Sequence, residues 1–120
     1  MLLIDKYIRY LRDVRRYSSR TVDIYERVLN DYAAFAARDE ERISDDELVK
    51  ALNPSEIREY EVSLLDADPP LSSRTVSLHL SALSSFCRYL LKEKMLRSNP
   101  VRLVPKPKAE KRLPHFFRKD

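Results

Sequence analysis

The residues best suited to chemistry lie between Ser73 and Lys92, where cations and hydroxyls recur at helical spacing. They are Ser73, Arg74, Thr75, Ser77, Ser81, Arg88 and Lys92, and no acidic residue occurs from Leu71 to Lys92. Short hydroxyl side chains between cations let a helix come close to a duplex, donate hydrogen bonds to phosphates and reach base edges, whereas long acidic side chains would repel the backbone. Solvated helix faces usually mix Glu with Lys. The pattern therefore favours a helix face that binds nucleic acid.

The start of this segment repeats an earlier part of the chain. Ser18–Val22 and Ser72–Val76 are identical in sequence, and each opens an apolar helical pattern. Two interpretations are open. The serines and threonines cap a helix, or the two helix N-termini present hydroxyls, N–H groups and an arginine to the same kind of anion. The first copy and the helix that it opens contain further DNA-binding candidates. Asp23, Glu26 and Asp31 lie on the same helix, and only the part of its surface without these acids can contact DNA. The added candidates are Ser19, Arg20, Thr21 and Arg27.

The formal net charge of +4 conceals a strong asymmetry along the chain. Residues 1–38 include 8 basic and 5 acidic residues, residues 39–68 include 3 and 11, and residues 69–120 include 12 and 3. The three segments therefore carry net charges of +3, −8 and +9. A basic region of this kind attracts a polyanion, because neutralised phosphates release their counterions. We expect nucleic acid as the partner, and accidental charge segregation in a helical protein is the alternative.

The elements that position these residues are predicted to be all-α. The 120-residue chain has no glycine or tryptophan, which argues against tight β-hairpins and excludes glycine-rich phosphate loops. Apolar residues spaced three and four apart, with N-cap and proline signals, predict the helices. The predicted helices are Leu2–Arg15, Arg20–Ala37, a short helix from Ser44 to about Leu52, Pro54–Leu65 and Ser73–Met95. Val14 is expected on the apolar stripe of the first helix. Glu56, Glu59 and Glu61 are expected on the outer side of the Pro54–Leu65 helix. The prolines and lysines of Val101–Asp120 predict an extended basic linker, whose Lys106 and Lys108 are further DNA-binding candidates.

No set of residues predicts an active site. His79 lies among apolar residues, which favours a core or boundary ring over a catalytic base, and His115 lies in the linker. Cys87 occupies a core position, where a thiol behaves as a small hydrophobe. The acidic residues 39–47 lack the turn-forming glycine of a calcium loop. We therefore expect no catalytic residue, no metal and no cofactor.

The cellular location is also predicted from what the sequence lacks. A single cysteine cannot form an internal disulfide, which favours a reducing compartment. No apolar run reaches the roughly 18 residues of a membrane span, and the apolar start is too short for a signal peptide. We expect a cytoplasmic protein that does not enter a membrane.

Three segments together resemble the N-terminal core-binding domain of tyrosine recombinases, the phage-integrase and Xer-type family. They are YLRDVRRYSSRTVDIYERVLNDYAAF, LSSRTVSLHLSALSSFCRYLLKEKML and SNPVRLVPKPKAEKRLP. The resemblance extends from about Leu3 to Pro114. Its most specific part runs from Ser-x-x-Thr through a long helix with Phe86-x-x-Tyr89-Leu90 to Asn99-Pro100 and a Pro-Lys linker that closes with Leu113-Pro114.

The resemblance implies a four-helix, SAM-like domain of two crossed hairpins that forms half of a C-shaped clamp on double-stranded DNA, which is therefore the expected partner. In this family the second and fourth helices face the major groove, and the first and last helices can touch neighbouring protomers of a recombining tetramer. Chemistry belongs to a separate C-terminal domain with an Arg/Lys/His/Arg set and a nucleophilic tyrosine. None of the seven tyrosines here is therefore expected to be that nucleophile. We expect a core-binding domain over residues 1–98, a linker over 99–120, and a chain that is a piece of a longer protein.

Two other functions remain as alternatives. A protein-interaction module of the SAM or death-domain kind would use its acidic and basic faces head to tail and would self-associate without nucleic acid. A transcriptional regulator would need a short recognition helix after a tight turn, which the long last helix argues against.

Overall fold

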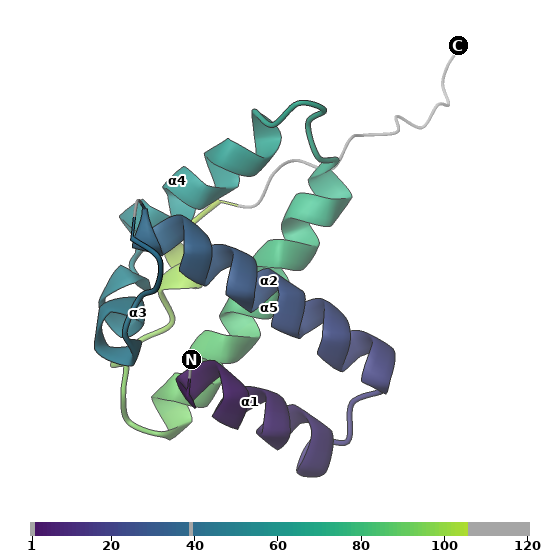
Figure 1. Ribbon diagram of the computed structural model, residues 1–120, viewed down its shortest axis with the longest axis vertical. Helices are drawn as coiled ribbons and strands as arrows, with labels where there is room; N and C mark the ends of the chain where they lie inside the picture. The colour runs from purple at the N-terminus through teal and green to yellow at the C-terminus, as the bar shows by residue number, and fades with distance from the viewer. Residues whose placement is uncertain (1, 39, 106–120) are drawn as a thin grey trace.

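The computed structural model describes residues 2–38 and 40–105, and in this part every regular element is a helix. The helices are α1 (Leu2–Asp13), α2 (Ser19–Ala37), α3 (Asp45–Ala51), α4 (Pro54–Leu65), α5 (Ser73–Lys92) and the 3₁₀ helix η1 (Pro100–Leu103). Figure 1 shows α1 and α2 as one antiparallel hairpin, α4 and α5 as a second, and α2 crossing α5. The predicted all-α fold is confirmed.

Side-chain caps explain why the helices begin where they do. Ser18, Ser44, Asn53 and Ser72 each have extended backbone and accept a hydrogen bond from the N–H three residues ahead. At Ser44 the bond is reciprocal, because Glu47 also accepts from the Ser44 N–H at 3.1 Å. Each cap satisfies an N–H group that has no partner within the helix.

The core lies between the two hairpins and is closed by α3 and η1. Its largest fully buried side chains come from every main helix, among them Tyr7, Tyr32, Ile57 and Phe86. The Tyr7 and Phe86 rings meet edge-on at 5.1 Å between centroids, and the Tyr32 and Tyr60 rings at 5.0 Å. Edge-to-face pairs of this kind each add about 0.5–1.5 kcal/mol beyond burial.

Two helices end earlier than the apolar patterns predict. The first was expected to reach Arg15, but α1 ends at Asp13, so Val14 lies 64% exposed instead of on the inward stripe. The last was expected to reach Met95, but α5 ends at Lys92. There Lys94 has φ 63°, and the N–H groups of Lys94 and Met95 donate to Leu91 and Leu90. This is a Schellman ending, in which a lysine takes the left-handed position that glycine usually occupies.

The segment after α5 also differs from the expectation. Instead of an extended chain from Val101, residues Pro100–Leu103 form η1, capped by the Asn99 side chain, which accepts from the Val101 N–H at 3.1 Å. Val101 and Val104 are each 6% exposed and belong to the core. The packed domain therefore continues past residue 98 to at least Val104, because two buried valines anchor this stretch. The rest of the predicted linker, from residue 106, lies outside the described residues.

Candidate nucleic-acid interface

The predicted cationic face of α5 lies on the side of the helix opposite the core. Arg74, Ser77, Ser81, Arg88 and Lys92 lie three, four or seven residues apart and share one side of the helix, and Ser73 lies four residues before Ser77. Thr75 does not share that side, because it lies seven residues before the buried Ala82. Arg74, Ser81, Arg88 and Lys92 are exposed, and Ser73, Thr75 and Ser77 are half-buried. In the part of the chain that the structure describes, the ion pairs involve Arg38 and Arg58, and none involves a cation of this face. The charge of these cations is therefore available to an external anion.

The candidates on α2 are exposed as well, but they share their helix with acids. Ser19, Arg20 and Arg27 are exposed and Thr21 is half-buried, while Asp23 and Asp31 are also exposed. The helix crosses α5 and packs on it (Figure 1). The structure thus brings α2 and α5 into contact, and α2 offers a more mixed surface than α5.

The repeated segment forms two equivalent N-caps. Ser18 Oγ accepts from the Thr21 N–H and Ser72 Oγ from the Thr75 N–H, both at 3.2 Å. In each copy the serine hydroxyl also donates to the threonine hydroxyl, at 3.0 and 3.1 Å. The capping interpretation of the repeat is therefore confirmed. Binding of an anion at these helix starts stays a prediction.

Arg88 lies at the junction of two small pockets that the sequence did not predict. One, of about 290 Å³, places it with Ser81, Ser84, Tyr25 and Arg102. Arg88 Nη1 donates to Ser84 Oγ at 3.2 Å, and Asn99 Nδ2 donates to the same oxygen at 2.9 Å.

The second pocket, of about 220 Å³, places Arg88 with Lys92 and with Arg15 and Tyr17 from the loop after α1. Arg15 and Arg102 are not among the candidates that the sequence predicted. The sequence feature that could have indicated Arg15 is the basic run before the first SSRTV copy. The feature that could have indicated Arg102 is its position directly after Pro100 and Val101. Lys106 and Lys108 lie outside the described residues.

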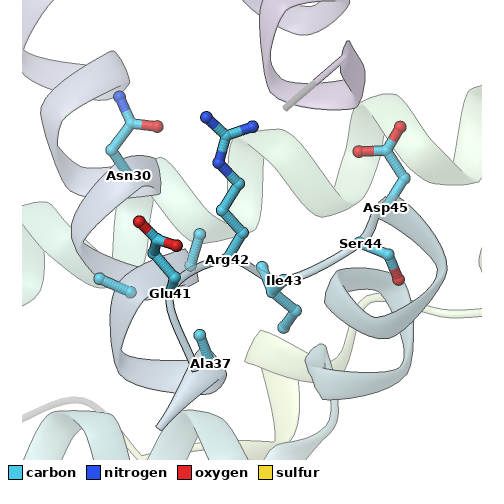
Figure 2. Close-up of a pocket in the computed structure, with 9 residues that line it drawn as sticks. Asn30, Ala37, Glu41, Arg42, Ile43, Ser44 and Asp45 are labelled. Atoms are coloured by element: carbon cyan, nitrogen blue, oxygen red, sulfur yellow. The ribbon is translucent and has the colours of Figure 1, made fainter. Parts of the chain in front are cut away.

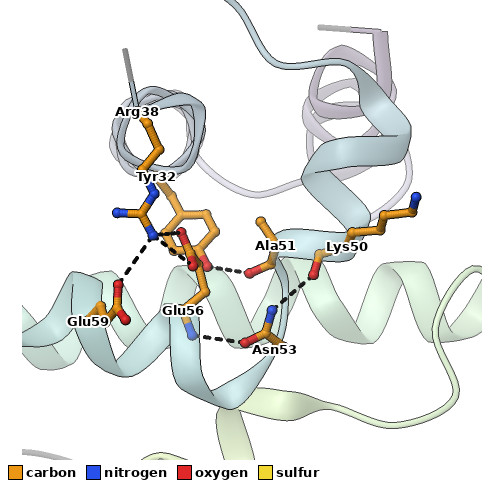
Figure 3. Close-up of polar contacts among 7 residues, drawn as sticks. All are labelled: Tyr32, Arg38, Lys50, Ala51, Asn53, Glu56 and Glu59. Carbon is orange, nitrogen blue, oxygen red and sulfur yellow. Dashed lines mark hydrogen bonds and ion pairs between the residues drawn. The ribbon is translucent and has the colours of Figure 1, made fainter. Parts of the chain in front are cut away.

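The acidic side of the molecule is less negative than the sequence predicts. Figure 3 shows Arg38 at the end of α2 reaching two of the predicted outer acids on α4. Its Nη2 lies 2.9 Å from Glu56 Oε2 and 3.3 Å from Glu59 Oε1. The same view shows the Tyr32 hydroxyl donating to the Ala51 carbonyl, which ties α2 to α3. These contacts hold α3 and α4 against α2 and its C-cap residue Arg38.

The third predicted outer acid, Glu61, is not outside. It is 4% exposed, because it follows Ile57 by four residues and precedes Leu64 by three and so shares their buried side. Burial raises the pKa of Glu61, and Arg58, with Nε 3.9 Å from Oε1, partly opposes this shift. Glu61 is therefore a core-facing acid that does not contribute to a surface that repels phosphate.

A larger pocket lies between the end of α2 and the segment before α3, away from the candidate face. Its volume is about 510 Å³, and Figure 2 shows Glu41, Arg42 and Ile43 on the connecting segment with Asn30 on α2 and Asp45 at the start of α3. Its charged lining residues include two acids and one base. This mixed lining does not match the chemistry of the α5 face.

The residues that could have served in catalysis have structural roles. The Tyr60 hydroxyl and His79 Nδ1 are hydrogen-bonded at 2.9 Å, and burial lowers the pKa of His79 while Asp31 partly opposes the shift. Burial raises the pKa of the Cys87 thiol to about 12 and also raises the pKa of Tyr7 well above its usual value. These groups are therefore neutral near pH 7.

Two kinds of feature are absent from the described part of the chain. No group of three or more His, Cys, Asp or Glu side chains in residues 2–38 and 40–105 is arranged to hold a metal ion. In the same residues, no helix combines the length and the apolar character that crossing a membrane requires.

The fold and the cationic helix face define a small all-helical domain with a basic surface on α5. Residues 4–94 match the family described as phage integrase, N-terminal SAM-like domain, and the chain belongs to this family. The resemblance inferred from the sequence is thereby confirmed.

Its relatives include recombinases from several bacteria. The chain is 32% identical over 115 residues to the tyrosine recombinase XerC of Bacillus subtilis, with 92% of this chain and 34% of the relative covered. It is 34% identical over 125 residues to the XerC of Pelotomaculum thermopropionicum, covering 98% and 38%. The chain thus spans little more than a third of the length of these relatives. No solved structure matches it.

Proposed function

We propose that the chain is the DNA-binding N-terminal domain of a site-specific tyrosine recombinase. The observation that carries the proposal is the exposed face of α5, where cations and hydroxyls occur without an acid and without an ion-pair partner among the described residues. Membership of the integrase family and the similarity to recombinases named XerC support it.

The residues divide into two roles under this proposal. The cations supply most of the affinity by neutralising phosphates, and they are Arg20, Arg27, Arg74, Arg88 and Lys92, with Lys106 and Lys108 of the following segment. The hydroxyls of Ser19, Thr21, Ser73, Thr75, Ser77 and Ser81 lie on shorter side chains and come closer to backbone or base edges. Phosphate contacts fix position on the duplex, whereas base contacts carry sequence preference.

The domain clamps one face of the duplex and positions a catalytic domain that belongs to the parent protein. Strand exchange is the task of that second domain, and this chain supplies no catalytic group. In the parent protein the domain also contacts other recombinase protomers assembled on DNA. The limited share of the recombinase relatives that the chain spans is consistent with this division.

A salt series on a labelled duplex of about 30 base pairs tests the proposal by fluorescence anisotropy. The logarithm of the binding constant should fall with the logarithm of salt concentration by about 0.9 per neutralised phosphate, with roughly five or more phosphates implied. Arg74→Gln should make the slope shallower by about 0.9.

Arg58→Gln is the control, because it removes the same charge from the exposed side of α4. Since Arg58 also pairs with Glu61, circular dichroism must first show unchanged thermal unfolding of this variant. Equal losses in the two variants would mean that net charge, not the α5 face, determines binding. A protein that ignores DNA at low salt but self-associates in sedimentation would be an interaction module instead.

A further inference from the structure

The smaller of the two pockets beside Arg88 has an unusual lining. It lies where the end of α1 and the following loop meet the last turns of α5, and its volume is about 220 Å³. Three of its eight lining residues are cations, three are tyrosines and none is acidic. The cations are Arg15, Arg88 and Lys92, and they come from two parts of the chain more than 70 residues apart.

Aromatic rings hold two of these cations in place without neutralising them. The Lys92 Nζ lies 4.8 Å from the centre of the Tyr10 ring, and the Arg15 guanidinium carbon lies 5.5 Å from the centre of the Tyr17 ring. A cation over a ring face keeps its full charge, whereas a carboxylate partner would cancel it. The pocket therefore keeps a net positive charge.

Three tyrosines, one leucine and one serine form the rest of the pocket wall. Leu11 is 1% exposed, and the Tyr10 and Tyr89 rings are tilted by 43° with 5.0 Å between their centroids. Ser85 supplies a hydroxyl that is hydrogen-bonded to the Tyr7 hydroxyl beneath it. Three cations gathered in one concave site act together on an anion and raise its local concentration.

We propose that this pocket binds one phosphodiester group of a DNA backbone, held jointly by Arg15, Arg88 and Lys92. The planar guanidinium groups suit two non-bridging phosphate oxygens, and the ammonium group acts as a point charge. The inference rests on the proposed function and extends it, because it brings α1 and its loop into a DNA contact that the sequence predicted only for α2, α5 and the linker.

The test compares two arginines that lie three residues apart. Arg15→Gln removes a pocket cation, and Arg12→Gln removes an exposed cation that does not line the pocket. Both are measured on the labelled duplex over the salt series, after circular dichroism shows unchanged thermal unfolding. We expect Arg15→Gln to make the salt slope shallower by about 0.9 and Arg12→Gln to leave it unchanged.

A double-variant cycle with Arg88→Gln tests whether the cations share one phosphate. Residues that contact the same group are coupled, so the double variant should lose clearly less than the sum of the two single losses. Additive losses would mean that each arginine has its own phosphate and would overturn the shared pocket.

Two further outcomes separate this inference from the proposed function. If Arg15→Gln binds like the wild type while Arg74→Gln binds more weakly, the pocket inference fails and the proposed function stands. If the wild type does not bind the duplex at low salt, the proposed function fails.

A competition experiment distinguishes the source of the phosphate. Inorganic phosphate at constant ionic strength should not displace the duplex, since a single ion gains none of the contacts along α5. Binding of inorganic phosphate to the wild type but not to Arg15→Gln, with the duplex still fully bound, would assign the pocket to the free ion and overturn its role on the backbone.

Discussion

The N-cap of α5 allows a quantitative test of what the repeated SSRTV segment does. In Ser72→Ala the Thr75 N–H loses its acceptor at 3.2 Å, and the Thr75 hydroxyl loses its donor at 3.1 Å. Replacing a serine N-cap by alanine costs about 1 kcal/mol. In a domain of about 100 residues this corresponds to a fall in Tm of about 4–8 °C. Ser18→Ala should have a similar effect, because the cap of α2 has the same geometry.

The assay is thermal unfolding followed by circular dichroism, with Ser81→Ala as the control. Ser81 is exposed in the middle of α5 and makes no side-chain hydrogen bond within the described residues. Alanine is the better helix former by up to about 0.7 kcal/mol, so this variant should keep or raise the Tm.

The DNA-binding assay then separates the two interpretations of the repeat. Ser72→Ala should leave the salt slope unchanged, because its hydroxyl is engaged in the cap. A variant with an unchanged Tm and weaker DNA binding would refute the capping argument and favour an anion site at the helix start.

Three further predictions concern the packed core. A chain that ends at Ser98 should be less stable than one that ends at Pro105 by about 3 kcal/mol or more, since each of the two buried valines after Ser98 contributes about 1.5–3 kcal/mol; urea unfolding of both chains measures this. The Cys87 thiol, whose pKa burial raises to about 12, should react with a thiol reagent only after urea unfolds the protein, and rapid labelling of the native protein would contradict its burial. Burial lowers the pKa of His79, so the unfolded chain binds a proton that the folded chain does not, and stability should fall as the pH drops below about 6.5. Urea unfolding between about pH 8 and 5 should show that part of the decrease in the wild type and not in His79→Gln.

Local signals in the sequence account for most of the helical architecture. The predicted bounds of α4 are those observed, because Asn53 caps the helix and Pro54 suits its first turn. The capping box at Ser44 likewise predicted the short α3. These signals act within one helical turn and do not depend on the rest of the fold.

The predicted ends of α1 and α5 and the predicted position of Glu61 were less accurate than the predicted helix starts. Lys94 ends α5 by taking a left-handed conformation, although lysine carries no local signal for such an ending. Glu61 is a charged residue of a type that usually lies on the surface. Only its spacing from Ile57 and Leu64 indicated that it faces the core. The expectation that Glu61 lies outside was therefore wrong.

The candidate interface also has one part that the sequence predicts and one part that depends on tertiary contacts. The sequence by itself determined the acid-free cationic face of α5, since residues on one helix face follow from helical spacing alone. Only the tertiary structure decided that Arg15 lies beside Arg88 and Lys92, and that the valines after Ser98 pack in the core. Both depend on contacts between segments far apart in the chain, and such contacts are set by how the two hairpins pack against each other.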